Sequence, residues 1–497
     1  MKHQRFLEKL FPWLIWVVSL INAVWLLLIP GEKTDAFLRI SYQRIMLLGL
    51  ILLPSIVLLI LRIGWGKAMT IRYAERKTKI ISTLAFWTLI GVGFFLLMPY
   101  ARFRLELSYE AWFGLLPVVL TYGMISLIWI GYNWLRLRSQ PVPVTTSSSR
   151  EVFIDFARGF AILLAVGSHA FYAFGYDILF GDAMYQVMSL TRLATPSFIL
   201  ITGMMFELVY LRKTEKQGFK AMVKSLISRA MQCYLAYGIT VLIEWFNQQL
   251  STADAQHAVI FMGNSLFSGI LQFYTLFLLL AIPIIWVRRR FGIWAISSLP
   301  VVVWMGDILL DRPAWPAPEQ PLGHLTALLF GNPEVSNFSM WHALTFMSFG
   351  MLVGYMYKRS KQAGSWSSFQ ITLLVLFLIC LVISLVTVFP TTLDDFFFDF
   401  SNTFRINHEI PYYSIGSMGA FLLLWLSWKL RRFLTHPWLE HTITRLGKDS
   451  LWAFAVGNSL AAMLPALSTQ TWFVVLFLVA VLGGSIVIIH LKKLAWK

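Results

Sequence analysis

Residues 153–174 read FIDFARGFAILLAVGSHAFYAF, an apolar stretch that is long enough to cross a bilayer as a helix and yet contains Asp155, Arg158 and His169. The step of eleven residues from Arg158 to His169 turns a helix by ~1100°, about 20° beyond three turns. The two side chains therefore share one face, about 16 Å apart along the axis, and Asp155 lies near that face. Because ionisable groups at membrane depth are costly, they normally face protein or a wet cavity. The stretch predicts a membrane helix that carries a functional site.

The rest of the chain is equally apolar. Of its 497 residues 58% are hydrophobic and 13% charged, and the mean hydropathy is +0.69, whereas soluble proteins have about 25% charged residues. We predict an all-α polytopic membrane protein with about fourteen transmembrane helices, and a re-entrant or surface helix at 322–331. The predicted spans are 11–30, 43–63, 80–99, 111–135, 153–174, 192–211, 231–246, 266–287, 291–310, 339–357, 370–390, 412–428, 450–466 and 471–491.

The basic residues alternate between loops. Of the 41 lysines and arginines, 32 fall in every second connecting segment or at the two ends of the chain. By the positive-inside rule, this pattern predicts that both the N- and C-termini are cytoplasmic. The net charge of +17 is thereby explained by topology, and no nucleic-acid partner is predicted.

A stretch rich in Pro, Ser and Thr at 139–150 is typical of a linker. It separates a four-helix N-terminal membrane module, 1–138, from a ten-helix membrane domain, 151–497. The first module has almost no polar group inside its predicted spans. We interpret 1–138 as a scaffold, a regulatory module or a docking surface for a membrane partner.

The predicted topology places Arg158 near the inner leaflet and His169 beyond the midplane toward the outside. A guanidinium pairs well with phosphate or carboxylate, and an imidazole that titrates near neutrality can take a proton from an attacking hydroxyl. The alternatives are that His169 is an interhelical hydrogen-bond partner and that Arg158 pairs with Asp155.

Several other polar residues are weaker candidates. Arg192 would bind a substrate carboxylate, stabilise an oxyanion or anchor a helix end, and Trp341 would stack on a sugar or lie in the interfacial aromatic belt. We interpret Glu244 and Asp307 as solvated helix ends. The sequence contains no metalloprotease, nucleotide-binding or hydrolase-elbow motif, and the cysteines have no metal-ligand spacing, so no metal and no bound cofactor are predicted.

The segment from Asp155 to His169 resembles the Arg-x10-His motif in the first helix of the acyltransferase-3 superfamily. The rest of the range 151–491 resembles the OpgC branch of that superfamily, membrane proteins that acylate periplasmic glucans. The segments that carry the likeness are Thr195–Phe206, Ser228–Tyr234, Leu271–Arg290, Trp341–Gly350 and Leu446–Phe454.

The resemblance implies a ten-helix enzyme of the bacterial inner membrane. It would move an acyl group, acetyl or succinyl, from cytoplasmic acyl-CoA to a hydroxyl of a periplasmic or cell-envelope glycan, with Arg158 binding the donor and His169 as general base. The chain departs from the family pattern at Asn458, where a histidine often stands. At Arg229 related families have clustered arginines, and this chain has only Ser228 beside it.

Two other functions stay open. The first is a transporter or flippase of polysaccharide or lipid-linked sugar, in which Arg158 and His169 lie on a translocation path. No inverted repeat or matched pair of broken helices, which are typical of such proteins, is evident in the sequence. The second is a non-catalytic membrane partner that recruits glycan enzymes.

Overall fold

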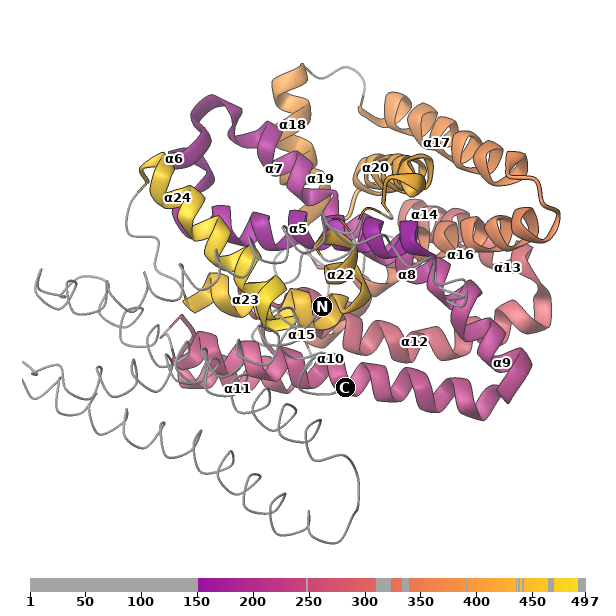
Figure 1. Ribbon diagram of the computed structural model, residues 1–497, viewed down its shortest axis with the longest axis horizontal. Coiled ribbons are helices and arrows are strands. Elements are labelled where there is room, and N and C mark those ends of the chain that lie inside the picture. The colour runs from indigo at the N-terminus through magenta and orange to yellow at the C-terminus, as the bar shows by residue number, and fades with distance from the viewer. Residues whose placement is uncertain are drawn as a thin grey trace, which may run out of the picture.

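The computed structural model describes residues 151–246, 249–309, 323–332, 339–388, 392–434, 442–463 and 469–489, with the single residues 436 and 439 (Figure 1). The predicted N-terminal module 1–138 and the linker 139–150 lie outside the described residues.

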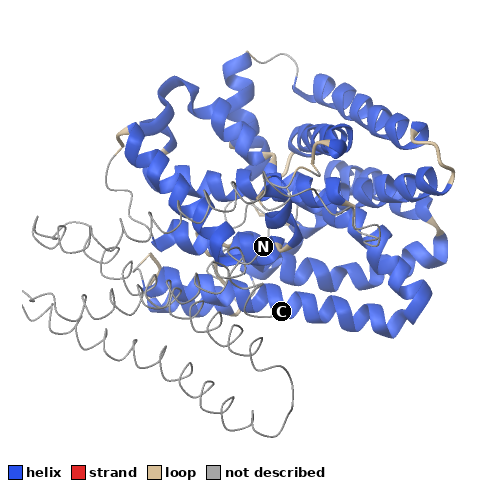
Figure 2. Cartoon of the chain, in the orientation of Figure 1, coloured by secondary structure: helices blue, strands red, loops and turns tan. Residues whose placement is uncertain are grey.

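The described residues are helical, with no β-strand among them (Figure 2). The first half contains α5 (Val152–Phe174), α6 (Tyr176–Phe180), η2 (Gly181–Ala183), α7 (Met184–Arg192), α8 (Ala194–Met205), the π-helical η3 (Phe206–Leu211), α9 (Arg212–Gln217), α10 (Phe219–Phe246), α11 (Thr252–Val259), α12 (Gly269–Phe291), α13 (Ile293–Ser297) and α14 (Leu299–Leu309). The second half contains α15 (Gly323–Phe330), α16 (Met340–Gln362), α17 (Ser367–Val388), α18 (Leu393–Ser401), α19 (Thr403–Ile406), α20 (Ile410–Lys429), η4 (Leu430–Arg432), α22 (Ile443–Lys448), α23 (Ser450–Met463), α24 (Thr471–Leu478) and the π-helical η5 (Val479–Gly483).

The prediction of a helical membrane protein is confirmed. Among the described residues, seven helical segments are long and apolar enough to cross a bilayer. They are Val152–Phe174, Tyr176–Gln217, Phe219–Trp245, Gly269–Phe291, Ser367–Val388, Ile410–Arg432 and Thr471–Ile489. The total of fourteen spans and the cytoplasmic location of both termini stay predictions.

Three of the ten spans predicted for 151–497 are not among these seven segments. The span 291–310 is divided into α13 and α14 immediately before Pro300, because a proline favours the first turn of a new helix. Of the span 450–466, the described residues 450–463 are helical and form α23. The span 339–357 lies in α16, which has 23 residues but is less apolar, and most of it is buried against other helices. A helix surrounded by protein does not need a continuous lipid-facing surface.

Helix α5 crosses the middle of the molecule and packs against α8, α20, α22 and α23 (Figure 1). Its contact with α22 is a backbone contact: a Cβ added at Gly159 would overlap the carbonyl of Ile443, and one added at Gly447 would overlap the carbonyl of Asp155. Small residues allow such close approach between membrane helices, where dispersion contacts replace the hydrophobic driving force. The same device joins α8 to α16, since Gly203 lies on the Met347 backbone.

One ion pair and one apolar helix show how side chains are placed between the interior of the bundle and the lipid. Glu207, in the π-helical turn after α8, is buried and accepts two hydrogen bonds of 2.8 Å from the Arg288 guanidinium of α12. This bidentate pair satisfies both charges inside the bundle. Helix α17 is the opposite case. Only 22% of its most apolar 18-residue stretch is buried, as expected for a helix that faces lipid.

Two glycines of α5 give a matched test of the α5–α22 contact. We expect Gly159→Ala to destabilise the protein by roughly 1–3 kcal/mol, because the new methyl group overlaps the Ile443 carbonyl. Gly167 has no atom within 4 Å of an added Cβ, so Gly167→Ala should be neutral or stabilising by about 0.5–1 kcal/mol. Thermal unfolding of both variants in the same detergent measures the difference. Equal unfolding temperatures would contradict the close packing of α5 on α22.

Candidate active site

A cavity of about 1520 Å³ lies between α5, α8, α10, α12 and α23, and both Arg158 and His169 line it. The two residues belong to one uninterrupted α-helix, α5. The prediction that they share a helix face is therefore confirmed by the cavity that both of them line.

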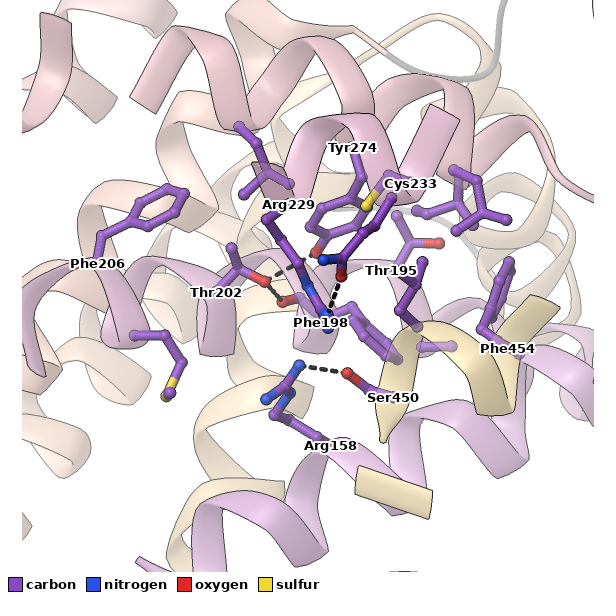
Figure 3. Close-up of a pocket in the computed structure, with 18 of the residues that line it drawn as sticks. Arg158, Thr195, Phe198, Thr202, Phe206, Arg229, Cys233, Tyr274, Ser450 and Phe454 are labelled. Atoms are coloured by element: carbon purple, nitrogen blue, oxygen red, sulfur yellow. Dashed lines mark hydrogen bonds between the residues drawn. The ribbon is translucent and has the colours of Figure 1, made fainter. Parts of the chain in front are cut away.

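The part of the cavity around Arg158 is strongly basic. Arg158 of α5 and Arg229 of α10 extend from opposite walls toward each other (Figure 3). The Arg158 guanidinium donates a hydrogen bond to Ser450 Oγ, at the start of α23, and Arg229 Nη1 donates one of 3.0 Å to Gln232 Oε1. The other basic residues of the lining near this end are Arg212, Lys213, Lys216, Lys224 and Lys448. All of them belong to segments that the distribution of basic residues predicts to be cytoplasmic.

The wall between the basic end and His169 is aromatic and hydroxylated. Phe198, Thr202 and Tyr274 line it, and the Thr202 and Tyr274 hydroxyls are hydrogen-bonded at 3.1 Å (Figure 3). Thr202 Oγ1 also donates to the Phe198 carbonyl, which leaves its hydroxyl firmly oriented. Such a wall fits an extended, uncharged chain better than a charged group.

His169 is held by Asn458 of α23. Its Nδ1 lies 2.8 Å from Asn458 Oδ1, while Asn458 Nδ2 donates a hydrogen bond of 2.6 Å to the Phe267 carbonyl. The second bond fixes the amide, so that an oxygen, which can only accept, faces the imidazole. Nδ1 must therefore carry the proton of the neutral ring, and the lone pair is on Nε2.

The Phe267 carbonyl is itself positioned by a buried carboxylate. Glu244, which is 0% exposed, accepts hydrogen bonds from Ser265 Oγ at 2.6 Å and from the backbone N–H groups of Leu266 and Phe267, both at 3.1 Å. The Phe267 ring meets the His169 ring edge to face, with centroids 5.7 Å apart. The interpretation of Glu244 as a solvated helix end was wrong, because the loop that follows α11 folds over it.

Helix α23 contacts both polar groups of α5 through one face. Ser450, Phe454 and Asn458 are spaced four residues apart, which places them in a row along the helix. Ser450 accepts a hydrogen bond from Arg158, and the Phe454 ring packs against the His169 ring with centroids 6.1 Å apart. Asn458 is hydrogen-bonded to Nδ1 of His169. One helix therefore orients both residues of the candidate pair.

The remaining predicted site residues are divided between the cavity and the protein interior. Asp155 is buried and lines the basic end, and Arg192 lines the cavity at the His169 end. Trp341 is outside the cavity lining, and its ring lies 3.3 Å from the Cβ position of Gly306 in α14. Asp307 is also not a free helix end, because it pairs with His342 Nε2 at 2.8 Å.

Three contributors to the site were not predicted from the sequence: Ser450, Asn458 as a partner of His169, and Arg405. Arg405 lies in the short helix α19, outside the predicted spans, and lines the cavity beside Arg192. Burial lowers the pKa of its guanidinium from the ordinary value. The described residues contain no group of three His, Cys, Asp or Glu side chains placed to hold a metal ion.

Comparison with protein-family models gives a match over the part of the chain that forms the site. A protein-family model described as an acyltransferase domain, of the acyltransferase-3 type, matches residues 151–490, about two thirds of the chain. This range contains every residue that lines the cavity. A comparison with curated proteins finds no match.

The tautomer of His169 can be tested directly. We expect the nitrogen NMR shifts of isotope-labelled histidine to show His169 protonated on Nδ1 when the ring is neutral, because Asn458 Oδ1 accepts that proton. The signal is assigned by its loss in His169→Gln. Asn458→Ala should shift the tautomer equilibrium toward Nε2–H, whereas Asn402→Ala, outside the cavity, should not. A wild-type ring protonated on Nε2 would refute the assignment.

Proposed function

We propose that this chain, which belongs to the acyltransferase-3 family of membrane acyltransferases, moves an acetyl or succinyl group from cytoplasmic acyl-CoA to a hydroxyl of a periplasmic or cell-envelope glycan. The observation that carries the proposal is one cavity with a basic end at Arg158 and a hydrogen-bonded histidine, His169, farther along the same helix. An OpgC-like role in the bacterial inner membrane, with both termini cytoplasmic, is part of this proposal.

The charge of the cavity supports an acyl-CoA donor. Nine lysines and arginines line it, against two carboxylates, Glu151 and Asp155. Coenzyme A has phosphates at one end, a neutral pantetheine arm and a thioester at the other end. In this proposal Arg158 and Arg229 bind phosphate oxygens, and the arm extends past Phe198 toward His169.

The chemistry requires one proton acceptor beside the thioester. The acceptor hydroxyl gives its proton to Nε2 of His169 while its oxygen attacks the thioester carbonyl. The tetrahedral intermediate collapses as the C–S bond breaks, the proton moves from the imidazolium to sulfur, and the products are an ester and free CoA. Asn458 Oδ1 stabilises the Nδ1–H of the imidazolium that forms in between, in the orienting position that a carboxylate occupies in serine hydrolases.

His169→Gln tests the proposed base. We expect acyl transfer to fall about 10²–10⁴-fold, the usual loss when a general base is removed. CoA release from acetyl- and succinyl-CoA is measured with a glucan acceptor, at matched amounts of folded protein. His436→Gln, an exposed histidine outside the cavity, is the control and should keep full activity.

Each other outcome of this assay identifies a different function. Full acylation by folded His169→Gln would remove His169 from the mechanism. If the wild type releases no CoA with any donor but moves a sugar across proteoliposomes, the chain is a flippase. If it does neither, the role of a non-catalytic membrane partner gains support.

Arg158→Lys tests donor binding. A planar guanidinium that makes two hydrogen bonds to phosphate is not replaced by a single ammonium charge, so we expect acyl-CoA affinity to fall about tenfold in Arg158→Lys and further in Arg158→Gln. Affinity is measured by calorimetry on purified protein. Arg359→Lys, at an exposed position outside the lining, is the control. Wild-type affinity in both Arg158 variants would make Arg158 a structural residue.

A further inference from the structure

Two arginines line the His169 end of the cavity. Arg192 is the last residue of α7 and Arg405 lies in α19, so separate segments bring them together. Both line the cavity, their positive charges repel one another, and both charges act on His169. Neither residue is needed for donor phosphate binding in the proposed reaction, because the basic residues around Arg158 serve that purpose.

Among the described residues, the charge of this pair is not balanced by a nearby carboxylate. The carboxylates of the cavity lining, Glu151 and Asp155, lie near the start of α5, and Asp155 precedes His169 by fourteen residues, about 21 Å along the helix. In the described part of the chain, no carboxylate forms an ion pair with Arg192 or Arg405.

The polar neighbours of the pair are uncharged. Arg405 lies near the Tyr412 hydroxyl, and the Tyr176 hydroxyl near Arg192 is already engaged with Ser168 at 2.8 Å. Nε of Arg192 is buried without a hydrogen-bond partner. Two partly buried guanidinium groups that repel each other, one of them with an unused donor, destabilise the protein unless an anion binds to both.

We propose that Arg192 and Arg405 form a binding site for an anionic group of a substrate, a carboxylate or a phosphate, held beside His169. The forked donors of a guanidinium match both anions in a bidentate geometry. This inference rests on the proposed function, which supplies two sources for the group. It is either a terminal carboxylate on the transferred acyl group, which would point past His169 away from the CoA, or an anionic substituent of the acceptor glycan.

Binding measured without turnover separates this site from the reaction itself. The donor probes are two unreactive thioethers, S-butyl-CoA and S-carboxypropyl-CoA, which differ in a terminal carboxylate. The acceptor probes are a neutral glucan oligosaccharide and an oligosaccharide of similar size that carries carboxylates. Calorimetry on the purified full-length protein gives four dissociation constants for the wild type and for each variant.

In one of the two pairs, we expect the wild type to bind the anionic probe about tenfold or more tightly than the neutral one, as for a charge-assisted hydrogen bond. Arg192→Gln and Arg405→Gln should remove that preference while leaving the neutral probe unchanged. If the variants lose the preference between the two donor probes, the anion belongs to the acyl group; if they lose it between the two acceptor probes, the anion belongs to the glycan. Arg359→Gln, exposed and outside the lining, should keep the preference.

Where a glutamine variant fails to fold, Arg405→Lys or Arg192→Lys replaces it and should keep a weaker preference for the anion, because the positive charge remains. Equal affinity of the wild type for anionic and neutral probes in both pairs overturns the inference. Equal weakening of all four probes in the folded variants also overturns it, since the arginines would then act on the fold or the reacting centre. An intact anion preference without any acyl transfer would refute the proposed function and leave the site standing.

Discussion

Ionisable side chains carried by apolar helices must be kept away from lipid, and the packing of this protein follows from that requirement. Glu207 and Arg288 satisfy each other across two helices, and Glu244 is enclosed by the hydroxyl and backbone N–H groups of a loop. Arg158 and His169 face a common cavity instead. Enclosing that cavity requires neighbouring helices to approach α5 closely, which glycines at the α5–α22 contact permit.

The same contacts that close the bundle also orient the candidate catalytic groups. Helix α23 approaches α5 where Gly457 leaves room for the Val166 side chain, only 2.7 Å from the position of a Cβ. That approach brings Asn458 within hydrogen-bonding distance of His169. Through the Phe267 carbonyl, Asn458 is in turn tied to the loop that Glu244 holds. The state of the imidazole therefore depends on two helices and a loop that are distant in sequence, as is usual for a group whose hydrogen-bonding partners select its tautomer.

In the proposed reaction, one cavity serves both for donor binding at the inner side of the membrane and for acyl transfer at the outer side. Its one end is basic, as the proposed phosphorylated donor would require, and its other end is lined by His169, Arg192 and Arg405. In the proposed reaction, a long neutral arm reaches across the protein, so that the acyl group arrives at the outer side while the phosphates stay at the inner one. Transfer by this route needs no alternation between inward-open and outward-open states. A translocation path for a whole sugar would instead need both ends of the cavity to pass a bulky polar molecule, which the aromatic wall at Phe198 and Tyr274 disfavours.

The helical membrane class and the shared face of Arg158 and His169 could be predicted from the residues alone, because both follow from local periodicity and the cost of burying charge. The span 291–310 was less well predicted, since the turn before Pro300 divides the helix without changing its apolarity. Three other features depend on how the helices pack: Asn458 orients His169, Glu244 is buried, and Arg405 lines the same cavity as Arg192. Asn458 is 289 positions from His169, Glu244 binds loop residues 21 to 23 positions away, and Arg192 and Arg405 lie in separate helices. No local pattern encodes which distant polar groups will meet.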